Sequence, residues 1–100
     1  MNKIPTEFTI HGHIIKVIIC SELENEKFGD YDCVKEEIHI AQNIRRDIEL
    51  IPLSDHQIET TFLHELIHAM QWHSGKEFSE EEAQTYSGML YEFLNTKKDG

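Results

Sequence analysis

Residues 54–73 of this 100-residue chain read SDHQIETTFLHELIHAMQWH, and they predict one long amphipathic helix. Ser54 is a preferred N-cap residue, and Gln57 three positions later completes a capping box. Apolar side chains then recur at helical spacing, until a Ser-Gly pair at 74–75 ends the pattern. We therefore expect a helix over about residues 55–73 whose apolar stripe packs on the rest of the chain.

The first half of the chain predicts strands. Residues 7–10 and 13–20 are alternating or rich in β-branched side chains, and the Gly-containing turn between them is typical of a β-hairpin. Because the second of these strands is almost wholly apolar, we expect it to be central. Turn residues and a short strand follow at 28–34. Residues 37–41 alternate, and we place this strand at the edge of the sheet because it is short and has a polar outer face.

The remaining segments complete the predicted layout. Residues 42–53 have no regular pattern, and we interpret them as a loop or a single turn. Ser79 is the expected N-cap of a second helix over about residues 80–96, with Glu82 as its acidic capping partner. The predicted apolar stripe of that helix contains Ala83, Tyr86, Leu90, Phe93 and Leu94.

Strands followed by two helices are typical of an α+β fold. We expect a single domain over residues 1–100, with a small, twisted, mainly antiparallel sheet of three or four strands across which the first helix packs.

Composition excludes several classes of partner. The formal charge of −10 comes from 19 acidic residues against nine Lys and Arg, so we expect no nucleic-acid partner and no anionic membrane surface. The first residues contain no apolar core of a signal peptide, and no apolar run is long enough to span a bilayer. Cys20 and Cys33 lack the spacing of a disulfide framework, which suits a reducing compartment. These features favour a cytoplasmic protein.

The predicted first helix carries the motif His64-Glu65-Leu66-Ile67-His68, which has the form H-E-x-x-H. On a helix, residues four positions apart lie on the same face, so both imidazoles can bind one Zn²⁺ ion. Glu65 lies about 100° around the helix from His64 and does not point at the same ion. Its carboxylate is instead placed to act as a general base on water activated by the zinc.

A catalytic zinc site needs a third protein ligand. His73 lies about 140° around the helix from His68, so we expect it to be a solvated residue near the helix C-terminus. The acidic residues of the second helix are better candidates. Glu80 shares a helical line with the predicted inward stripe, whereas Glu81 should face water. Glu80 is therefore the expected third ligand, and Glu81 is the alternative. The opposing interpretation is an acidic first turn that only complements the helix dipole.

Residues 64–68 together with the segment 80–87, EEEAQTYS, resemble the gluzincin metallopeptidases. That group combines H-E-x-x-H with a downstream glutamate in E-x-x-A-N-x-F-A, as in ImmA/IrrE-type enzymes. In length and layout the chain is similar to the minigluzincins and to small phage-type metallopeptidases. Gln84 departs from the pattern, because the longer families have Asn or Asp there, and this puts the partner that orients the zinc ligands in doubt.

The resemblance implies a peptidase with one zinc ion, held by His64, His68 and Glu80, and with Glu65 as general base. It also implies that the strand containing Ile38, His39 and Ile40 pairs with an extended peptide substrate.

Two alternatives remain open. The first is a non-catalytic interaction module in which zinc is structural. The second is a latent enzyme whose cleft is blocked, by its own tail or by a second copy. We expect a peptide or protein as the substrate or partner, and a monomer or a weak homo-oligomer.

Overall fold

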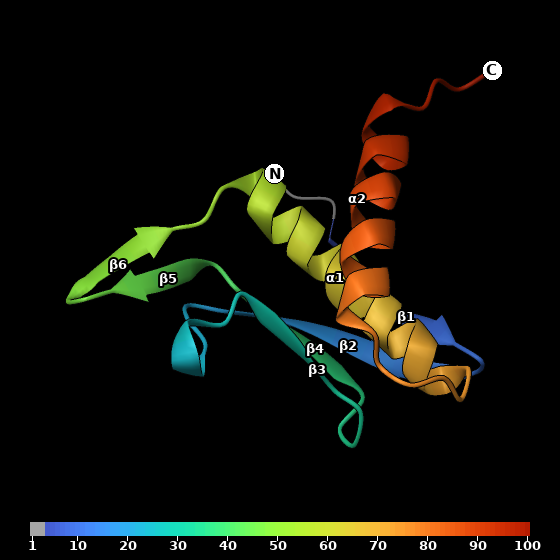
Figure 1. Cartoon of the computed structure of the whole chain (residues 1–100), viewed down its shortest axis with the longest axis horizontal. Helices are drawn as coiled ribbons and strands as arrows, with labels where there is room; N and C mark the ends of the chain where they lie inside the picture. Colours follow the sequence, from blue (N-terminus) through green and yellow to red (C-terminus); the bar gives the residue numbers. More distant parts are fainter. Residues whose placement is uncertain (1–3) are drawn as a thin grey trace.

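The computed structural model describes residues 4–100 and has an α+β fold (Figure 1). The six strands come first along the chain, and a single 3-10 turn at Glu24–Glu26 interrupts them. In order they are β1 (Glu7–Ile10), β2 (His13–Cys20), β3 (Gly29–Asp32), β4 (Glu37–Ala41), β5 (Asn43–Arg46) and β6 (Glu49–Pro52). Two helices follow, α1 (Asp55–His73) and α2 (Glu80–Thr96).

The main sheet has four strands in the order β1-β2-β4-β3. The predicted hairpin of β1 and β2 is present, with Phe8 opposite Ile15. β2 is an inner strand, as its apolar sequence predicts. It pairs in parallel with β4, and β3 pairs antiparallel with β4 on the other side. The sheet is therefore mixed: it contains one parallel pair of strands and two antiparallel pairs.

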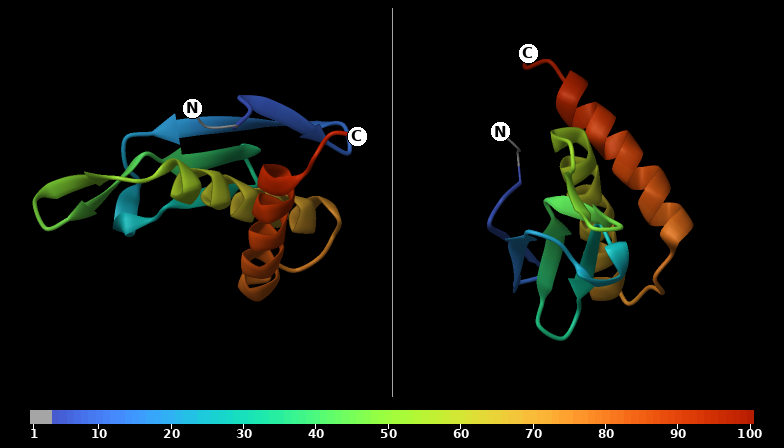
Figure 2. Two further views of the ribbon diagram at one scale, coloured as in Figure 1. Left: turned by 90° about the horizontal axis from the view of Figure 1, so that it is seen from above. Right: turned by 90° about the vertical axis from the view of Figure 1, so that its left-hand side faces the viewer.

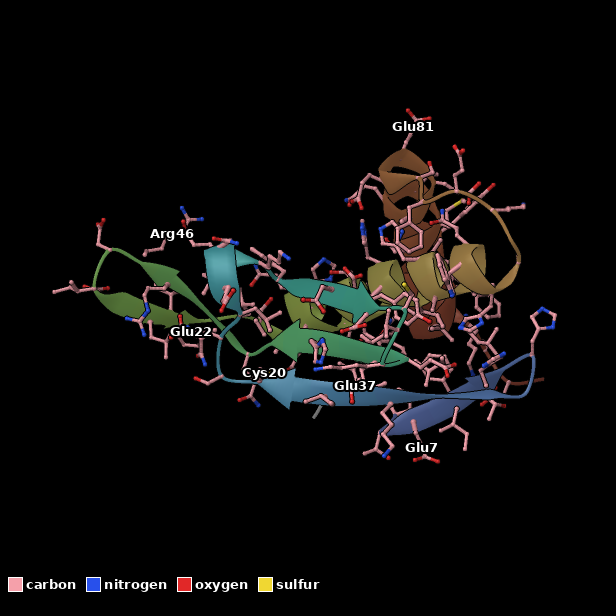
Figure 3. All side chains as sticks on the ribbon, turned by 90° about the horizontal axis from the view of Figure 1, so that it is seen from below. Glu7, Cys20, Glu22, Glu37, Arg46 and Glu81 are labelled. Carbon is pink, nitrogen blue, oxygen red and sulfur yellow. The ribbon has the colours of Figure 1, made fainter. Side chains whose placement is uncertain are left out.

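The expected position of β4 at the sheet edge is wrong. β4 lies between β2 and β3, and its backbone pairs on both sides. Ile38 and Ile40 are completely buried in the core. His39 lies on the face opposite to Ile38 and Ile40, as the alternation predicts. A polar residue on this face does not indicate an edge strand, because neither described helix covers the face (Figure 3). The edge strand at this side is β3.

The segment 42–53 is also more regular than its sequence suggests. β5 and β6 form a separate two-stranded hairpin that extends to one side of the molecule (Figure 1). Arg45 joins it to the loop before β3 through hydrogen bonds to the two carboxylate oxygens of Glu22, at 3.0 and 2.7 Å. Such an exposed pair fixes position more than it stabilises the fold.

Helix α1 begins and ends as the sequence predicts. The Ser54 hydroxyl accepts a hydrogen bond from Gln57 N at 3.1 Å, and the Gln57 side chain accepts one from Ser54 N at 2.9 Å. This reciprocal pair satisfies two backbone N–H groups that the first turn leaves without partners. At the other end, Ser74 is the C-cap, and Gly75 has the positive φ, 74°, that commonly follows a helix.

Both helices lie on one side of the main sheet (Figures 1 and 2). Helix α1 packs across the sheet, and α2 rises from the middle of α1, away from the strands. The buried core between sheet and α1 consists of Ile15, Val17, Ile38, Ile40, Ile58, Phe62 and Leu63. Neither of the two described helices covers the other face of the sheet, as the view from below shows (Figure 3).

The predicted stripe of α2 is correct only in part. Ala83 is buried and Leu90 packs against the core, but Tyr86, Phe93 and Leu94 are exposed. Ser87, one turn after Ala83, is buried. Within residues 4–100, neither helix has the length and apolar composition required to cross a membrane.

Candidate metal centre

The structure brings together the three residues that the sequence nominates as ligands. His64 and His68 project from one face of α1, and Glu80 is the first residue of α2. Nε2 of His64 lies 3.0 Å from Oε2 of Glu80, and Nε2 of His68 lies 2.7 Å from Oε1 of the same carboxylate. Ligand atoms around a tetrahedral zinc ion are roughly 3.3 Å apart, given bond lengths near 2 Å. The separations here are hydrogen-bond distances and somewhat shorter, so these two imidazoles and one carboxylate could hold such an ion after a small outward shift of the exposed Glu80 side chain.

Glu80 is the acidic residue of its turn that lies next to the two histidines. Its carboxylate faces the two histidines, whereas Glu81 points away from the sheet into solvent (Figure 3). The Glu80 side chain is mostly exposed, and the partial desolvation beside the histidines opposes its ionisation only weakly. The positive potential of His68 and the hydrogen bonds from both imidazoles outweigh this, so the pKa of Glu80 is lowered. The group is therefore a carboxylate at neutral pH, which is the form that binds a cation.

His68 is held by a residue that the sequence did not single out. Its Nδ1 lies 2.9 Å from Oε1 of Gln71, and both side chains are buried. The Gln71 amide has only one satisfactory orientation. Its Nε2 donates to Glu82 Oε1 at 2.8 Å and to the Ser79 carbonyl at 3.3 Å, so Oε1 must be the atom that accepts from Ser79 N.

This orientation determines the tautomer of His68. Since Oε1 of Gln71 is an acceptor, Nδ1 of His68 must carry the proton and donate it. Nε2 faces the Glu80 carboxylate, which can only accept a hydrogen bond, so this nitrogen donates a proton to Glu80 when no ion is bound. It is the nitrogen whose lone pair a cation would use in place of that proton. A hydrogen bond to the far nitrogen is how proteins orient metal-binding imidazoles.

The same contacts correct the role expected of Glu82. Ser79 is the N-cap of α2, and its hydroxyl accepts from Glu82 N at 3.1 Å. The Glu82 carboxylate does not complete a capping box, however, because it accepts from Gln71 instead. Gln84, where the sequence departs from the gluzincin pattern, is exposed and lines the cleft. The hydrogen-bond partner of His68 is instead Gln71, on α1 itself.

Glu65 is a buried acid beside the two histidines, with 7% of its surface exposed. Burial raises its pKa to about 7, an effect that the charge of His68 opposes and that the carboxylates of Asp30 and Glu80 increase. A carboxylate with a pKa near neutrality can both accept and return a proton at physiological pH.

These groups line a cleft of about 630 Å³. One wall is the edge of the sheet, from Lys27 to Tyr31, and the others come from α1 and the start of α2. β3 pairs only with β4 among the described strands, so its outer edge is open to the cleft. An exposed strand edge presents backbone groups that can pair with another extended chain.

Gly29 lets β3 approach α1 closely. A Cβ atom at this position would lie 2.6 Å from Thr61 Cγ2 and 3.4 Å from Glu65 Cγ. The glycine therefore allows the strand to lie directly beside the buried acid. No other glycine of the described chain has a neighbour this close.

The three residues of β4 predicted to bind substrate are not in the cleft. Ile38 and Ile40 are in the core, and the strand has no free edge. His39 points to the open face of the sheet, where Nδ1 lies 2.7 Å from Asp30 Oδ1 and Nε2 lies 3.0 Å from Glu37 Oε1. The edge strand that lines the cleft is β3.

His73 is another correction. Only 8% of its side chain is exposed, so it is not the solvated residue that its position near the helix C-terminus suggested. Its Nε2 is hydrogen-bonded to the Tyr31 hydroxyl at 2.9 Å. A contact between residues 42 positions apart cannot be deduced from helical periodicity.

No known protein family, curated protein sequence or solved structure matches this chain.

Proposed function

We propose that this protein is a zinc-dependent peptidase of minimal size. In this proposal His64, His68 and Glu80 hold one zinc ion, and Glu65 is the general base. The observation that carries it is the convergence of two imidazole nitrogens and a carboxylate on the floor of an open cleft, next to a buried acid whose pKa is about 7. When bound, zinc polarises a carbonyl group and lowers the pKa of water.

The protein's own residues supply the remaining steps. Glu65 accepts a proton from water at its carboxylate and later transfers it to the nitrogen of the leaving amine, so the peptide bond is hydrolysed without net gain or loss of protons. Nδ1 of His68 stays protonated because Gln71 accepts its hydrogen bond, and the imidazole keeps one orientation. The bound cation itself favours the ionised form of Glu65.

The open edge of β3 supports an extended peptide as the substrate. A peptide that pairs with Gly29–Asp32 would add a strand to the sheet and pass over His64 and Glu65. Backbone pairing reads the shape of an extended chain rather than its side chains. N-methylation of single backbone amides in a cleaved peptide should therefore abolish cleavage at one or more positions, because a methyl group removes the donor and blocks the strand edge.

A structural role for the ion is the competing interpretation. Glu80 is 80% exposed in its side chain, and the cleft is open, whereas structural zinc sites are normally closed by four protein ligands. These features favour catalysis over a purely structural ion.

Zinc content and peptide cleavage should be measured for the wild type, Glu65→Gln and Glu81→Gln. We expect Glu65→Gln to bind zinc and to lose at least roughly 100-fold in cleavage rate. The matched control Glu81→Gln should retain both properties, because its side chain points into solvent. A wild type that binds no zinc would refute the proposal, and equal activity of wild type and Glu65→Gln would leave only the structural role.

A second comparison tests which glutamate is the third zinc ligand. Glu80→Gln should weaken zinc binding, because an amide oxygen carries no charge, whereas Glu81→Gln should not. The reverse pattern would transfer the third-ligand role to Glu81.

A further inference from the structure

A second group of side chains that could bind a metal ion lies outside the cleft. His13 at the start of β2, Glu36 in the β3–β4 turn and His73 at the end of α1 place one ligand atom each within 4.8 Å of the others. Neither the histidines nor the glutamate line the cleft. None of the three belongs to the H-E-x-x-H motif or to the acidic turn that follows it.

The possible ligand atoms of His13, Glu36 and His73 lie close to one another. Nδ1 of His13 lies 2.8 Å from Oε2 of Glu36, and Nε2 of His73 lies 3.9 Å from the same oxygen. The two values lie on either side of the roughly 3.3 Å that separates ligands around a tetrahedral zinc ion. The imidazole rings of His13 and His73 are neighbours, with centroids 4.7 Å apart.

Glu36 provides an independent indication. Its Oε2 is buried, and within residues 4–100 it accepts no hydrogen bond of acceptable geometry, although His13 is close. A buried carboxylate oxygen that accepts no well-aligned hydrogen bond is costly, and a cation in contact with it removes the cost.

The surroundings favour positive charge. His73 is the last residue of α1, so the partial negative charge of the helix C-terminus lies at this point. Tyr31 adds a hydroxyl 2.9 Å from Nε2 of His73. When Nε2 of His73 binds an ion, the Tyr31 hydroxyl can turn towards the Glu36 carboxylate, or it can bind the ion as a fourth ligand.

We propose that His13, Glu36 and His73 form a second site for a zinc-type cation, independent of the candidate metal centre in the cleft. Two imidazoles and one carboxylate select zinc and similar transition metals over Mg²⁺ or Ca²⁺, which prefer oxygen ligands. The ion joins three segments that are far apart in sequence: the β1–β2 hairpin, the β3–β4 turn and the end of α1. Because the ligands are dispersed in the unfolded chain, binding stabilises the folded state.

Metal stoichiometry tests the proposal directly. Untagged protein should be stripped with a chelator, loaded with Zn²⁺ and desalted, and its zinc content measured by elemental analysis. We expect about two ions per chain in the wild type and about one in His13→Asn. His11→Asn is the matched control, since His11 is an exposed histidine in the same hairpin turn and asparagine tolerates its φ of 49°. It should retain both ions.

The two sites can be separated by a variant without the ligands of the cleft. His64→Ala/His68→Ala should still bind about one Zn²⁺ ion, and Mg²⁺ in excess should not displace it. Zinc should raise the melting temperature of this variant, and the additional change Glu36→Gln should remove that increase. Glu36→Gln keeps the shape of the side chain, so it also tests the site if His13→Asn does not fold.

Each result decides one proposal. If His64→Ala/His68→Ala binds no zinc, or if His13→Asn and His11→Asn have the same zinc content, the second site is refuted. If the wild type and His64→Ala/His68→Ala both bind one ion, which His13→Asn loses, the second site stands and the proposed function fails. Displacement of the zinc by Mg²⁺ would overturn the assignment to a zinc-type cation.

Discussion

Oε1 of Gln71 accepts a hydrogen bond from Nδ1 of His68 at 2.9 Å, and this contact determines which nitrogen of His68 faces Glu80. The amide is in turn fixed by Ser79 and Glu82, at the start of α2. Residues of both helices therefore orient one imidazole. Because all of these groups are at least partly buried, water cannot easily replace them.

Gln71→Leu should weaken zinc binding by roughly 10- to 100-fold, because Nδ1 of His68 loses the acceptor that fixes the tautomer. Gln71→Glu should also weaken binding, because an oxygen would replace the Nε2 donor beside Glu82 Oε1 and the Ser79 carbonyl. The measurement is competition with a chromophoric chelator. Gln84→Leu, an exposed change in the cleft wall, is the control and should have wild-type affinity. Equal affinities of Gln71→Leu and Gln84→Leu would show that Gln71 does not position His68.

Gly29→Ala should lower the free energy of unfolding by about 1–3 kcal/mol, because the added methyl group lies 2.6 Å from Thr61 Cγ2. Thr61→Ser removes that methyl carbon and should recover part of the loss in the double variant. Chemical denaturation of the wild type, the two single variants and the double variant measures the coupling between residues 29 and 61.

Gly88→Ala is the control for Gly29→Ala. It adds a methyl group with no neighbour within 4 Å inside a helix, so it should be neutral or slightly stabilising. Additive effects of the two changes would contradict the close approach of β3 to α1.

His39 should titrate above its usual pKa of 6.5. Burial alone would lower the pKa of this imidazole, but hydrogen bonds to the carboxylates of Asp30 and Glu37 outweigh it. Since the folded pKa is above the unfolded one, the stabilisation is fully present below pH 6.5 and is lost as the pH rises through the folded pKa. NMR titration of His39 should give a midpoint above 6.5.

Asp30→Asn should lower that midpoint, because the amide carries no negative charge, whereas Asp47→Asn in the exposed β5–β6 turn should leave it unchanged. A wild-type midpoint at or below 6.5 would show that burial outweighs the two carboxylates.

Ser54→Ala should cost about 1 kcal/mol of stability, because Gln57 N loses its acceptor at the helix start. Thermal or denaturant unfolding gives the value. Ser74→Ala at the other end of α1 should be close to neutral, since the backbone of Ser74 makes the capping contacts there. A larger loss at Ser74 than at Ser54 would contradict this account of how α1 is delimited.

The sequence by itself determined the local structure. The capping residues and apolar period of residues 54–73 predicted α1 to the residue, because caps and helical faces depend on side chains within one or two turns. The same periodicity placed Glu80, not Glu81, on the side that faces His64 and His68. The β1–β2 hairpin followed from β-branched strands around a glycine turn.

Only the tertiary structure decided the order of the strands and the contacts across the chain. The parallel pairing of β2 with β4 places β3 at the cleft edge, and alternation in β4 cannot reveal which neighbours it has. The regular hairpin of residues 43–52 has too weak a pattern to be recognised. Gln71 contacts residues of the next helix, and His13, Glu36 and His73 come together from segments far apart in sequence. Such contacts are set by the packing of whole elements, which no local pattern encodes.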